Sequence, residues 1–299
     1  MISASSMPAY KDEKIRTLLT YDDKRGIASE ILRHSDPLEV VHVAKAIVRT
    51  TASSIIIVTG FFVRGKPETD GPLGAVLLGF ALHSLGWRVS FASAPECLSL
   101  IRKCANFPAG FIEFPLMPEE ESKRFADKVL HHEKPGCLIS IEVCGRTAEG
   151  QYLNMKGEDI ESATPRLDCL FLSEAARGLF SIGIGDGGNE VGFGSVSPGI
   201  LSRCGVHPCV VNTKHLLVAS VSNWAAYALL AFISIETGHR FFPDSNQEQR
   251  LLKCLVDNGA VDGFSGRRIC RVDGRAAHTS QLFLRNLEGI YATLQIRRE

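Results

Sequence analysis

The sequence predicts an α/β protein, a single domain in which a mostly parallel sheet is wrapped by helices on both faces. Short β-branched apolar runs alternate with helical segments along the 299 residues, as they do in βαβ units. The most glycine-rich stretch directly follows one of these runs, at a strand end where α/β proteins bind ligands. A chain of this length also buries a sizeable core. These observations favour a Rossmann-like three-layer arrangement.

The first expected strand is Ser54–Gly60 (SIIIVTG), a β-branched run that ends in glycine. A polar loop follows, and Pro72 then occupies a position that the first turn of a helix tolerates. The helix expected over Leu73–Leu85 is apolar nearly all round, so we expect it to be buried. Trp87–Ala92 is the next expected strand, and it completes a right-handed βαβ unit.

The alternation continues through the rest of the chain. Further strands are expected at Phe111–Phe114, Cys137–Val143, Phe180–Gly185 and Pro208–Asn212. A charged helix is expected from Glu119 to His131, and an amphipathic helix over residues 278–294 offers a leucine stripe to the core. We expect residues 1–14 to be a flexible N-terminus and residues 15–296 to form the domain.

One uncharged stretch, Leu216–Ile235, is long enough to cross a bilayer. Serine and asparagine side chains interrupt it, and it is rich in alanine rather than leucine. A helix buried between the layers of an α/β domain explains the same pattern. We therefore expect a buried helix here and no membrane partner.

The charge balance excludes further classes of partner. The 33 basic and 33 acidic side chains cancel, so the chain lacks the electrostatic footprint of a nucleic-acid-binding or membrane-surface protein.

The nine cysteines include no C-x-x-C pair, which matches neither a zinc site nor a disulfide framework. We expect free thiols in a reducing compartment. The sequence also has no zincin, P-loop or G-x-S-x-G motif.

The strongest local signal is Gly183–Gly194 (GIGDGGNEVGFG), in which six of twelve residues are glycine. Such density indicates positive φ angles or a ligand close to the backbone. The start matches the G-x-G-x-x-G dinucleotide pattern, but no acidic residue for a ribose occurs between Val191 and Ile235. Asp186 and Glu190 would also repel a pyrophosphate. The loop suits an ammonium or a metal ion better, and we expect neither NAD nor FAD.

Four further clusters combine polar side chains with glycines or strand ends. Glu68–Pro72 follows the first strand, and Glu142 and Arg146 follow another. Asn223 lies within the long apolar stretch, where a buried amide must find partners in the core or on a ligand. Val261–Gly266 is a turn-like cluster near the C-terminus. Each also has a structural explanation, as a helix cap, an ion pair, a core hydrogen bond or a turn.

Together these motifs resemble the C-terminal domain of D-glutamate cyclases. They occur in that family's order: Thr59–Phe61, Glu68–Ala75, Ile141–Glu142 with Gly145–Arg146, Gly183–Gly194, Val221–Trp224 and Val261–Gly266. The resemblance covers residues 15–295, and Lys24–Ile27 looks like the family's opening motif. It implies conversion of D-glutamate to 5-oxo-D-proline and water. It also implies a mitochondrial matrix location, with the cytoplasm as the alternative, although no targeting segment is evident.

In that reaction the substrate amine attacks the side-chain carboxylate of the same molecule. The chemistry requires a base, an acid, donors for an oxyanion and a cation for the α-carboxylate. On chemical grounds the candidate catalytic residues are Asp186, Glu190, Asp70 and Glu142. The candidate substrate-binding residues are Gly60, Thr69, Arg146, Gly187, Gly188, Asn189 and Asn223. Among these, the backbone of residues 187–189 is the expected oxyanion nest, and Arg146 is the expected carboxylate ligand.

Two other functions stay open at this point. The chain could be a non-catalytic module that binds an acidic amino acid or a nucleotide through the glycine loop. It could also be a metal-dependent hydrolase or lyase that uses the four acidic residues. A divalent metal ion is the one cofactor considered, without assigned ligands. The expected partner is a small acidic amino acid, and a homo-oligomer is compatible with the sequence.

Overall fold

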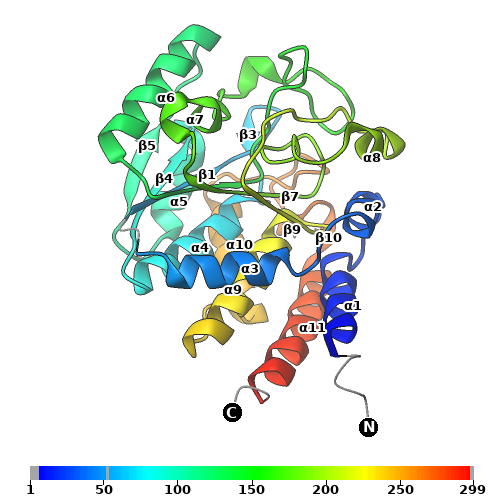
Figure 1. Ribbon diagram of the computed structural model, residues 1–299. Helices are drawn as coiled ribbons and strands as arrows, with labels where there is room; N and C mark the ends of the chain where they lie inside the picture. Colours follow the sequence, from blue (N-terminus) through cyan, green and yellow to red (C-terminus); the bar gives the residue numbers. More distant parts are fainter. Residues whose placement is uncertain (1–6, 52–53, 297–299) are drawn as a thin grey trace.

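The computed structural model describes residues 7–51 and 54–296, and its centre is a six-stranded parallel sheet (Figure 1). The strands are β1 (Ser54–Thr59), β4 (Arg88–Ser93), β5 (Gly110–Glu113), β6 (Cys137–Ile141), β7 (Phe180–Gly185) and β8 (His215–Val218). Their spatial order is β5-β4-β1-β6-β7-β8. The chain moves outward from β1 to β5 and then returns to place β6 beside β1. Open α/β sheets bind ligands at the carboxyl ends of strands at such a reversal.

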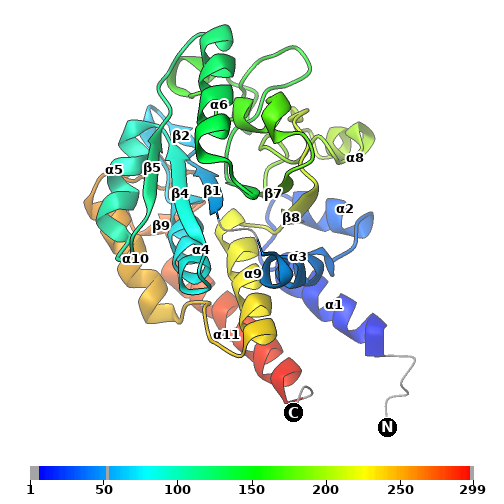
Figure 2. The ribbon, with the colours of Figure 1, turned by 60° about the vertical axis from the view of Figure 1, so that its left-hand side comes forward.

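Helices cover both faces of the sheet, which confirms the expected three-layer α/β fold (Figures 1 and 2). One layer contains α3 (Glu39–Arg49), α4 (Pro72–Ser84), α5 (Pro95–Cys104) and α9 (Ser222–Thr237). The other contains α2 (Ile27–Arg33), α6 (Glu119–Glu133), α7 (Cys169–Leu172) and α8 (Pro198–Arg203). Outside the first layer lie α1 (Met7–Leu19), α10 (Ser245–Asp257) and α11 (Ala277–Gln295). Two hairpins, β2–β3 (Phe62–Val63, Lys66–Pro67) and β9–β10 (Arg271–Val272, Arg275–Ala276), complete the fold.

The side chains of β1 show why both faces must be covered. Ile55 and Ile57 belong to the core shared with α4 and α9, whereas Ile56 and Val58 belong to the core shared with α6. Successive side chains of a strand point to opposite faces, so an apolar run such as this one requires a helical layer on each side. The expected strand at Ser54–Gly60 is thus confirmed.

The long apolar stretch divides into a strand and a helix, which corrects the expectation of one helix over Leu216–Ile235. Leu216 belongs to β8, the edge strand beside β7, and α9 begins only at Ser222. The helix is buried on every side because the sheet lies against it and α3, α4 and α11 pack around it. Among residues 7–51 and 54–296, no helix has the length and hydrophobicity that a membrane crossing needs.

The expected strand at Pro208–Asn212 does not form, and the edge position beside β7 belongs to β8. The backbone of this segment pairs with loops instead. The N–H of Cys209 donates to the carbonyl of Gly188, and the N–H of Val210 donates to the carbonyl of Arg146. These bonds hold the segment against the glycine loop and the loop after β6, with Val211 buried and Val210 exposed.

The N-terminal region also differs from expectation. Residues 7–14, expected to be flexible, form the first turns of α1, whose residues Ile15, Leu18 and Leu19 are anchored in the core. In Figures 1 and 2 this helix lies beside α11. Residues 1–6 of the predicted flexible segment lie outside the described residues. Helices α2, α3, α5, α7, α8 and α10 were not predicted from the sequence.

Candidate active site

Acidic side chains gather at the carboxyl ends of the central strands, where the strand order reverses. Asp70 follows β1 after the β2–β3 hairpin, Glu142 directly follows β6, and Asp186 directly follows β7. Carboxylate oxygens of Asp70, Asp186 and Asp273 all lie within 4.8 Å of one another, and so do those of Glu142, Asp186 and Glu190. The structure therefore brings the four sequence-predicted acidic residues into one cluster and adds Asp273 to them.

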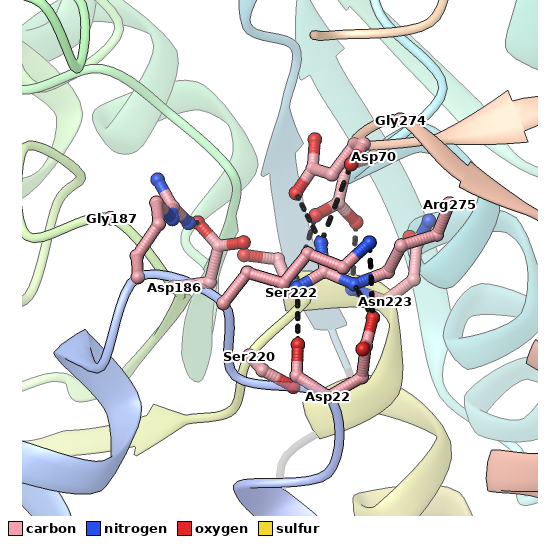
Figure 3. A network of polar contacts seen from close by, with 12 residues as sticks. Asp22, Asp70, Asp186, Gly187, Ser220, Ser222, Asn223, Gly274 and Arg275 are labelled. Atoms are coloured by element: carbon pink, nitrogen blue, oxygen red, sulfur yellow. Dashed lines mark hydrogen bonds and ion pairs between the residues drawn. The ribbon is translucent and has the colours of Figure 1, made fainter. Parts of the chain in front are cut away.

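Asp70 and Asn223 cap each other's helices (Figure 3). The carboxylate of Asp70 accepts hydrogen bonds from the backbone N–H groups of Ser222 (2.9 Å) and Asn223 (2.8 Å) at the start of α9. The side-chain oxygen of Asn223 accepts hydrogen bonds from the N–H groups of Gly71 (3.1 Å) and Gly74 (2.8 Å) at the start of α4. These bonds satisfy donors that a helix N-terminus otherwise leaves unpaired. They also fix the site to two core helices.

Glu142 adopts an unusual backbone conformation directly after β6. Its φ is 50°, in the left-handed region that few non-glycine residues adopt. The backbone is held there by a hydrogen bond from the Glu142 N–H to the carbonyl of Ile184 (3.0 Å). The carboxylate accepts a hydrogen bond from the hydroxyl of Ser222. Such strain persists where the surroundings determine it, typically at functional sites.

We expect Gly71→Ala to disrupt this site and to destabilise the protein by on the order of 3 kcal/mol or more. Gly71 has a φ of 89°, and a Cβ there would lie 2.7 Å from the Cβ of Glu142 and 2.8 Å from the Oγ1 of Thr59. The matched control is Gly86→Ala, because Gly86 has a φ of 90° but no atom within 4 Å of an added Cβ. Thermal melts should show the larger loss for Gly71→Ala, and equal losses would contradict the role of close packing.

Arg25 forms an ion pair with Asp186, with 2.6 Å between Nη2 and Oδ1. The Asp186 side chain is only 3% exposed, and its Oδ2 has no hydrogen-bond partner among the described residues. Burial lowers the pKa of Arg25, but the charges of Asp186, Asp273 and Glu190 together raise the pKa above its ordinary value. Arg25 therefore remains a cation inside the acidic cluster.

The carboxylate of Glu190 accepts hydrogen bonds from the backbone of its own glycine loop. Its Oε1 accepts a hydrogen bond from the N–H of Gly187 (2.8 Å), and its Oε2 accepts one from the N–H of Gly188 (2.7 Å). These are two of the donors that the sequence suggested as an oxyanion nest. Because the chain's own carboxylate occupies them, the loop presents negative charge rather than free N–H donors to a ligand.

Burial and mutual repulsion raise the pKa values of the clustered carboxyl groups. Burial, with a further contribution from the charge of Asp186, raises the pKa of Asp70 to about 7, although backbone N–H donors oppose the shift. Burial and the same charge raise the pKa of Glu190 to about 7. Burial also raises the pKa values of Glu68, Glu142 and Asp273. In the absence of a bound cation, the cluster therefore holds protons near neutral pH.

The raised pKa values of Asp70 and Glu190 predict that the cation-free protein is more stable at pH 5.5 than at pH 8. The ordinary pKa values are 3.8 for Asp70 and 4.5 for Glu190, so between these values and about 7 the folded state keeps protons that the unfolded state releases. Stability therefore falls as pH rises through this window. In chelator-containing buffer we expect the melting temperature to drop by on the order of 5 °C. A melting temperature that stays constant or rises from pH 5.5 to pH 8 would contradict the raised pKa values. The Asp70→Asn variant should show a smaller drop in melting temperature than wild type.

Three charged residues join the site without having been predicted as site residues. Glu68 is buried, and its short bridge to Val261 connects the region after β1 with the C-terminal part of the chain. Asp273 lies in the turn between β9 and β10 with a φ of 50°. Arg25 lies between α1 and α2. The sequence signals available were the motif Lys24–Ile27 for Arg25 and the turn-like motif Val272–Gly274 for Asp273.

Arg146 is engaged outside the acidic cluster. Its Nε donates to Asp168 and its Nη1 donates to Glu119, each over 2.7 Å. Asp168 is buried and also accepts a hydrogen bond from the hydroxyl of Tyr152 (2.6 Å). The guanidinium that was predicted to bind a substrate carboxylate thus already has two carboxylate partners, whereas Arg25 lies within the cluster.

The other predicted substrate-binding residues build the frame of the site. The hydroxyl of Thr69 donates to the carbonyl of Arg271 (2.7 Å), which ties the loop after β1 to the β9–β10 hairpin. The side-chain amide of Asn189 donates to the carbonyl of Leu153 (2.9 Å). Gly60 has a φ of 119° at the end of β1. Asn223 uses its side chain to cap α4, as described above.

The fold and the candidate site define an α/β protein with a buried cluster of acidic side chains at the carboxyl ends of parallel strands. Comparison with known families agrees with this class. The model described as "D-glutamate cyclase-like, C-terminal" matches residues 13–288, and the chain belongs to this family, which confirms the resemblance seen in the sequence. Human mitochondrial D-glutamate cyclase is 29% identical over 271 residues. The match covers 77% of this chain but 44% of the human protein, so this chain spans less than half of that relative.

A solved structure of an exopolyphosphatase-related protein from Bacteroides fragilis also resembles the chain. The match covers 86% of this chain and 59% of that chain, with 12% sequence identity and a TM-score of 0.41. A likeness at this level carries no functional assignment.

Proposed function

We propose that the chain is a D-glutamate cyclase-like lyase that converts D-glutamate to 5-oxo-D-proline and water. The observation that carries this proposal is the buried cluster of carboxylates around Arg25 at the strand reversal, in a chain of the D-glutamate cyclase-like family. A buried acidic site attracts the ammonium group of an amino acid. The human relative is mitochondrial by name, and we propose the same compartment for this chain.

The reaction joins the substrate nitrogen to its side-chain carboxyl carbon and breaks one bond from that carbon to oxygen. The ammonium loses two protons, and both leave in the water that forms. A carboxylate near the ammonium acts as the base, and a carboxyl group with a pKa near 7, as at Asp70 and Glu190, suits proton exchange at neutral pH. Holding the substrate folded contributes proximity, on the order of 7 kcal/mol or more.

Arg25 is proposed to bind a substrate carboxylate in place of Arg146. Its guanidinium is half-buried, charged and within 2.6 Å of Asp186, so it supplies a cation beside the acidic groups. In this arrangement the ammonium of the substrate faces the carboxylates of the cluster, and one of the two substrate carboxylates faces Arg25. The opposite charges of the substrate then set its orientation.

The test uses this chain alone with D-glutamate and, separately, L-glutamate. Chiral chromatography of the reaction mixture should show 5-oxo-D-proline at a rate far above that of protein-free buffer. Calorimetry on the same preparation should show saturable binding of D-glutamate. Binding without any 5-oxoproline would support the alternative of a non-catalytic amino-acid-binding module and would overturn the proposed lyase.

A further inference from the structure

The acidic cluster contains more carboxyl groups than its neighbouring cations can balance once these groups are ionised. Among the described residues, Arg25 pairs with Asp186, and Arg275, which also pairs with Asp22 (3.0 Å), lies 3.9 Å from Asp273. The buried or nearly buried carboxylates are Glu68, Asp70, Glu142, Asp186, Glu190 and Asp273. A substrate that itself carries two carboxylates would be repelled by this excess. Additional positive charge in the site would remove the repulsion.

The carboxylate oxygens form two sets that share one residue. Asp186 groups with Asp70 and Asp273 in one set and with Glu142 and Glu190 in the other, with all oxygens of a set within 4.8 Å of one another. Hard divalent cations such as Mg²⁺ and Mn²⁺ take oxygen ligands of this kind, and waters or substrate oxygens complete their coordination. One carboxylate shared by two sets is the arrangement of a bridging ligand.

An independent observation also points to a missing ligand. The Oδ2 of Asp186 is buried and has no hydrogen-bond partner among the described residues, although Oδ1 pairs with Arg25. The Oγ1 of Thr59, at the end of β1, is likewise buried without a partner among those residues. Burying an unpaired polar atom costs free energy, and such atoms call for a specific explanation. A cation bound beside Asp186 supplies one.

We propose that the site binds two divalent cations of the Mg²⁺ or Mn²⁺ type with Asp186 as their bridging ligand. Asp70 and Asp273 complete the ligands of one cation, and Glu142 and Glu190 complete those of the other. The role of the cations in catalysis rests on the proposed function: they neutralise the site, bind the substrate side-chain carboxylate and stabilise the oxygen that leaves as water. Glu68 belongs to neither set, so with the cations bound it replaces Asp70 and Glu190 as the group that accepts a proton from the ammonium.

The test is a titration of chelator-treated, full-length protein with Mn²⁺, followed by the electron paramagnetic resonance signal of the free ion. We expect two bound ions per chain, with a spectrum that shows magnetic coupling, because paired sites of this kind are about 4 Å apart. One ion, none, or two uncoupled ions per chain would overturn the proposal. Mg²⁺ should compete for both sites.

Single variants separate the two sets. Asp273→Asn and Glu142→Gln should each retain one ion with an uncoupled spectrum, whereas Asp186→Asn should weaken both sites at least about tenfold. Asp257→Asn, which alters an exposed carboxylate that pairs with Lys253, should bind two ions as wild type does. Circular dichroism confirms folding of each variant. If Asp186→Asn still binds two coupled ions, the bridge is wrong.

The experiments distinguish a failure of the proposed cation site from a failure of the proposed function. Two bound ions without any cyclisation of D-glutamate would leave the cation site standing and overturn the proposed function. Cyclisation by protein that binds no Mn²⁺ would overturn the cation site and leave the proposed function standing.

Discussion

Asp186→Asn is expected to lower the rate of D-glutamate cyclisation by about a hundredfold or more while changing the melting temperature by less than about 3 °C. Asp186 is the one residue common to both carboxylate sets, and it pairs with Arg25. Asparagine has nearly the same size but lacks the charge that attracts an ammonium or a metal ion. The fold should tolerate the change because Oδ2 makes no hydrogen bond among the described residues.

The matched control for this prediction is Asp257→Asn. Asp257 is exposed and pairs with Lys253 within α10, an interaction of small energetic value. Its variant should match wild type in both rate and melting temperature. Near-normal turnover in Asp186→Asn with an unchanged melt would remove Asp186 from the mechanism and would direct attention to Glu190 and Asp70.

Asn223→Ala is expected to lower the melting temperature by roughly 5 to 10 °C and to abolish activity. The side chain of Asn223 accepts hydrogen bonds from the N–H groups of Gly71 and Gly74 and donates one to the carbonyl of Thr69 (3.1 Å). Alanine leaves the N–H of Gly74 and the carbonyl of Thr69 without this partner, at about 1 to 3 kcal/mol each, whereas the N–H of Gly71 keeps its hydrogen bond to Asp70 (3.0 Å). The loop that carries Asp70 would remain attached to α9 through the backbone N–H groups of Ser222 and Asn223, but it would lose the side-chain hydrogen bonds that fix its geometry.

Two variants test whether these hydrogen bonds are the cause. Asn223→Asp retains an acceptor for the N–H groups of Gly71 and Gly74 but loses the donor to the carbonyl of Thr69. Its melting temperature should therefore lie between those of the Asn223→Ala variant and wild type. Asn258→Ala removes a half-buried asparagine at the end of α10 and should cost much less. A melt of Asn223→Ala within about 2 °C of wild type would show that the reciprocal caps contribute little.

The central strands and the acidic cluster could be predicted because local sequence determines them. Ser54–Gly60 has an apolar β-branched centre, so it requires a buried strand, and the glycine loop follows another predicted strand at Phe180–Gly185. In a parallel sheet the carboxyl ends lie at one edge, so residues that follow different strands meet there. Asp70, Glu142 and Asp186 meet for this reason.

The parts that escaped prediction depend on contacts between distant segments. Nothing near Arg146 in sequence shows that Asp168 and Glu119 hold its guanidinium. Likewise, the turn that carries Asp273 reaches the cluster only because the β9–β10 hairpin joins the loop after β1 through Thr69. The strand predicted at Pro208–Asn212 was wrong for a related reason, since its backbone pairs with the glycine loop rather than with β7.

The most direct test of the proposed lyase follows the nitrogen of the substrate. D-Glutamate labelled with ¹⁵N is incubated with the chain and Mg²⁺, and directly detected ¹⁵N NMR spectra are recorded over time. We expect the ¹⁵N signal of the ammonium to be replaced by that of a lactam nitrogen, and we expect this conversion to be lost in Asp186→Asn. A labelled ammonium that persists unchanged beside folded protein and saturating Mg²⁺, at the level of a protein-free sample, would contradict it.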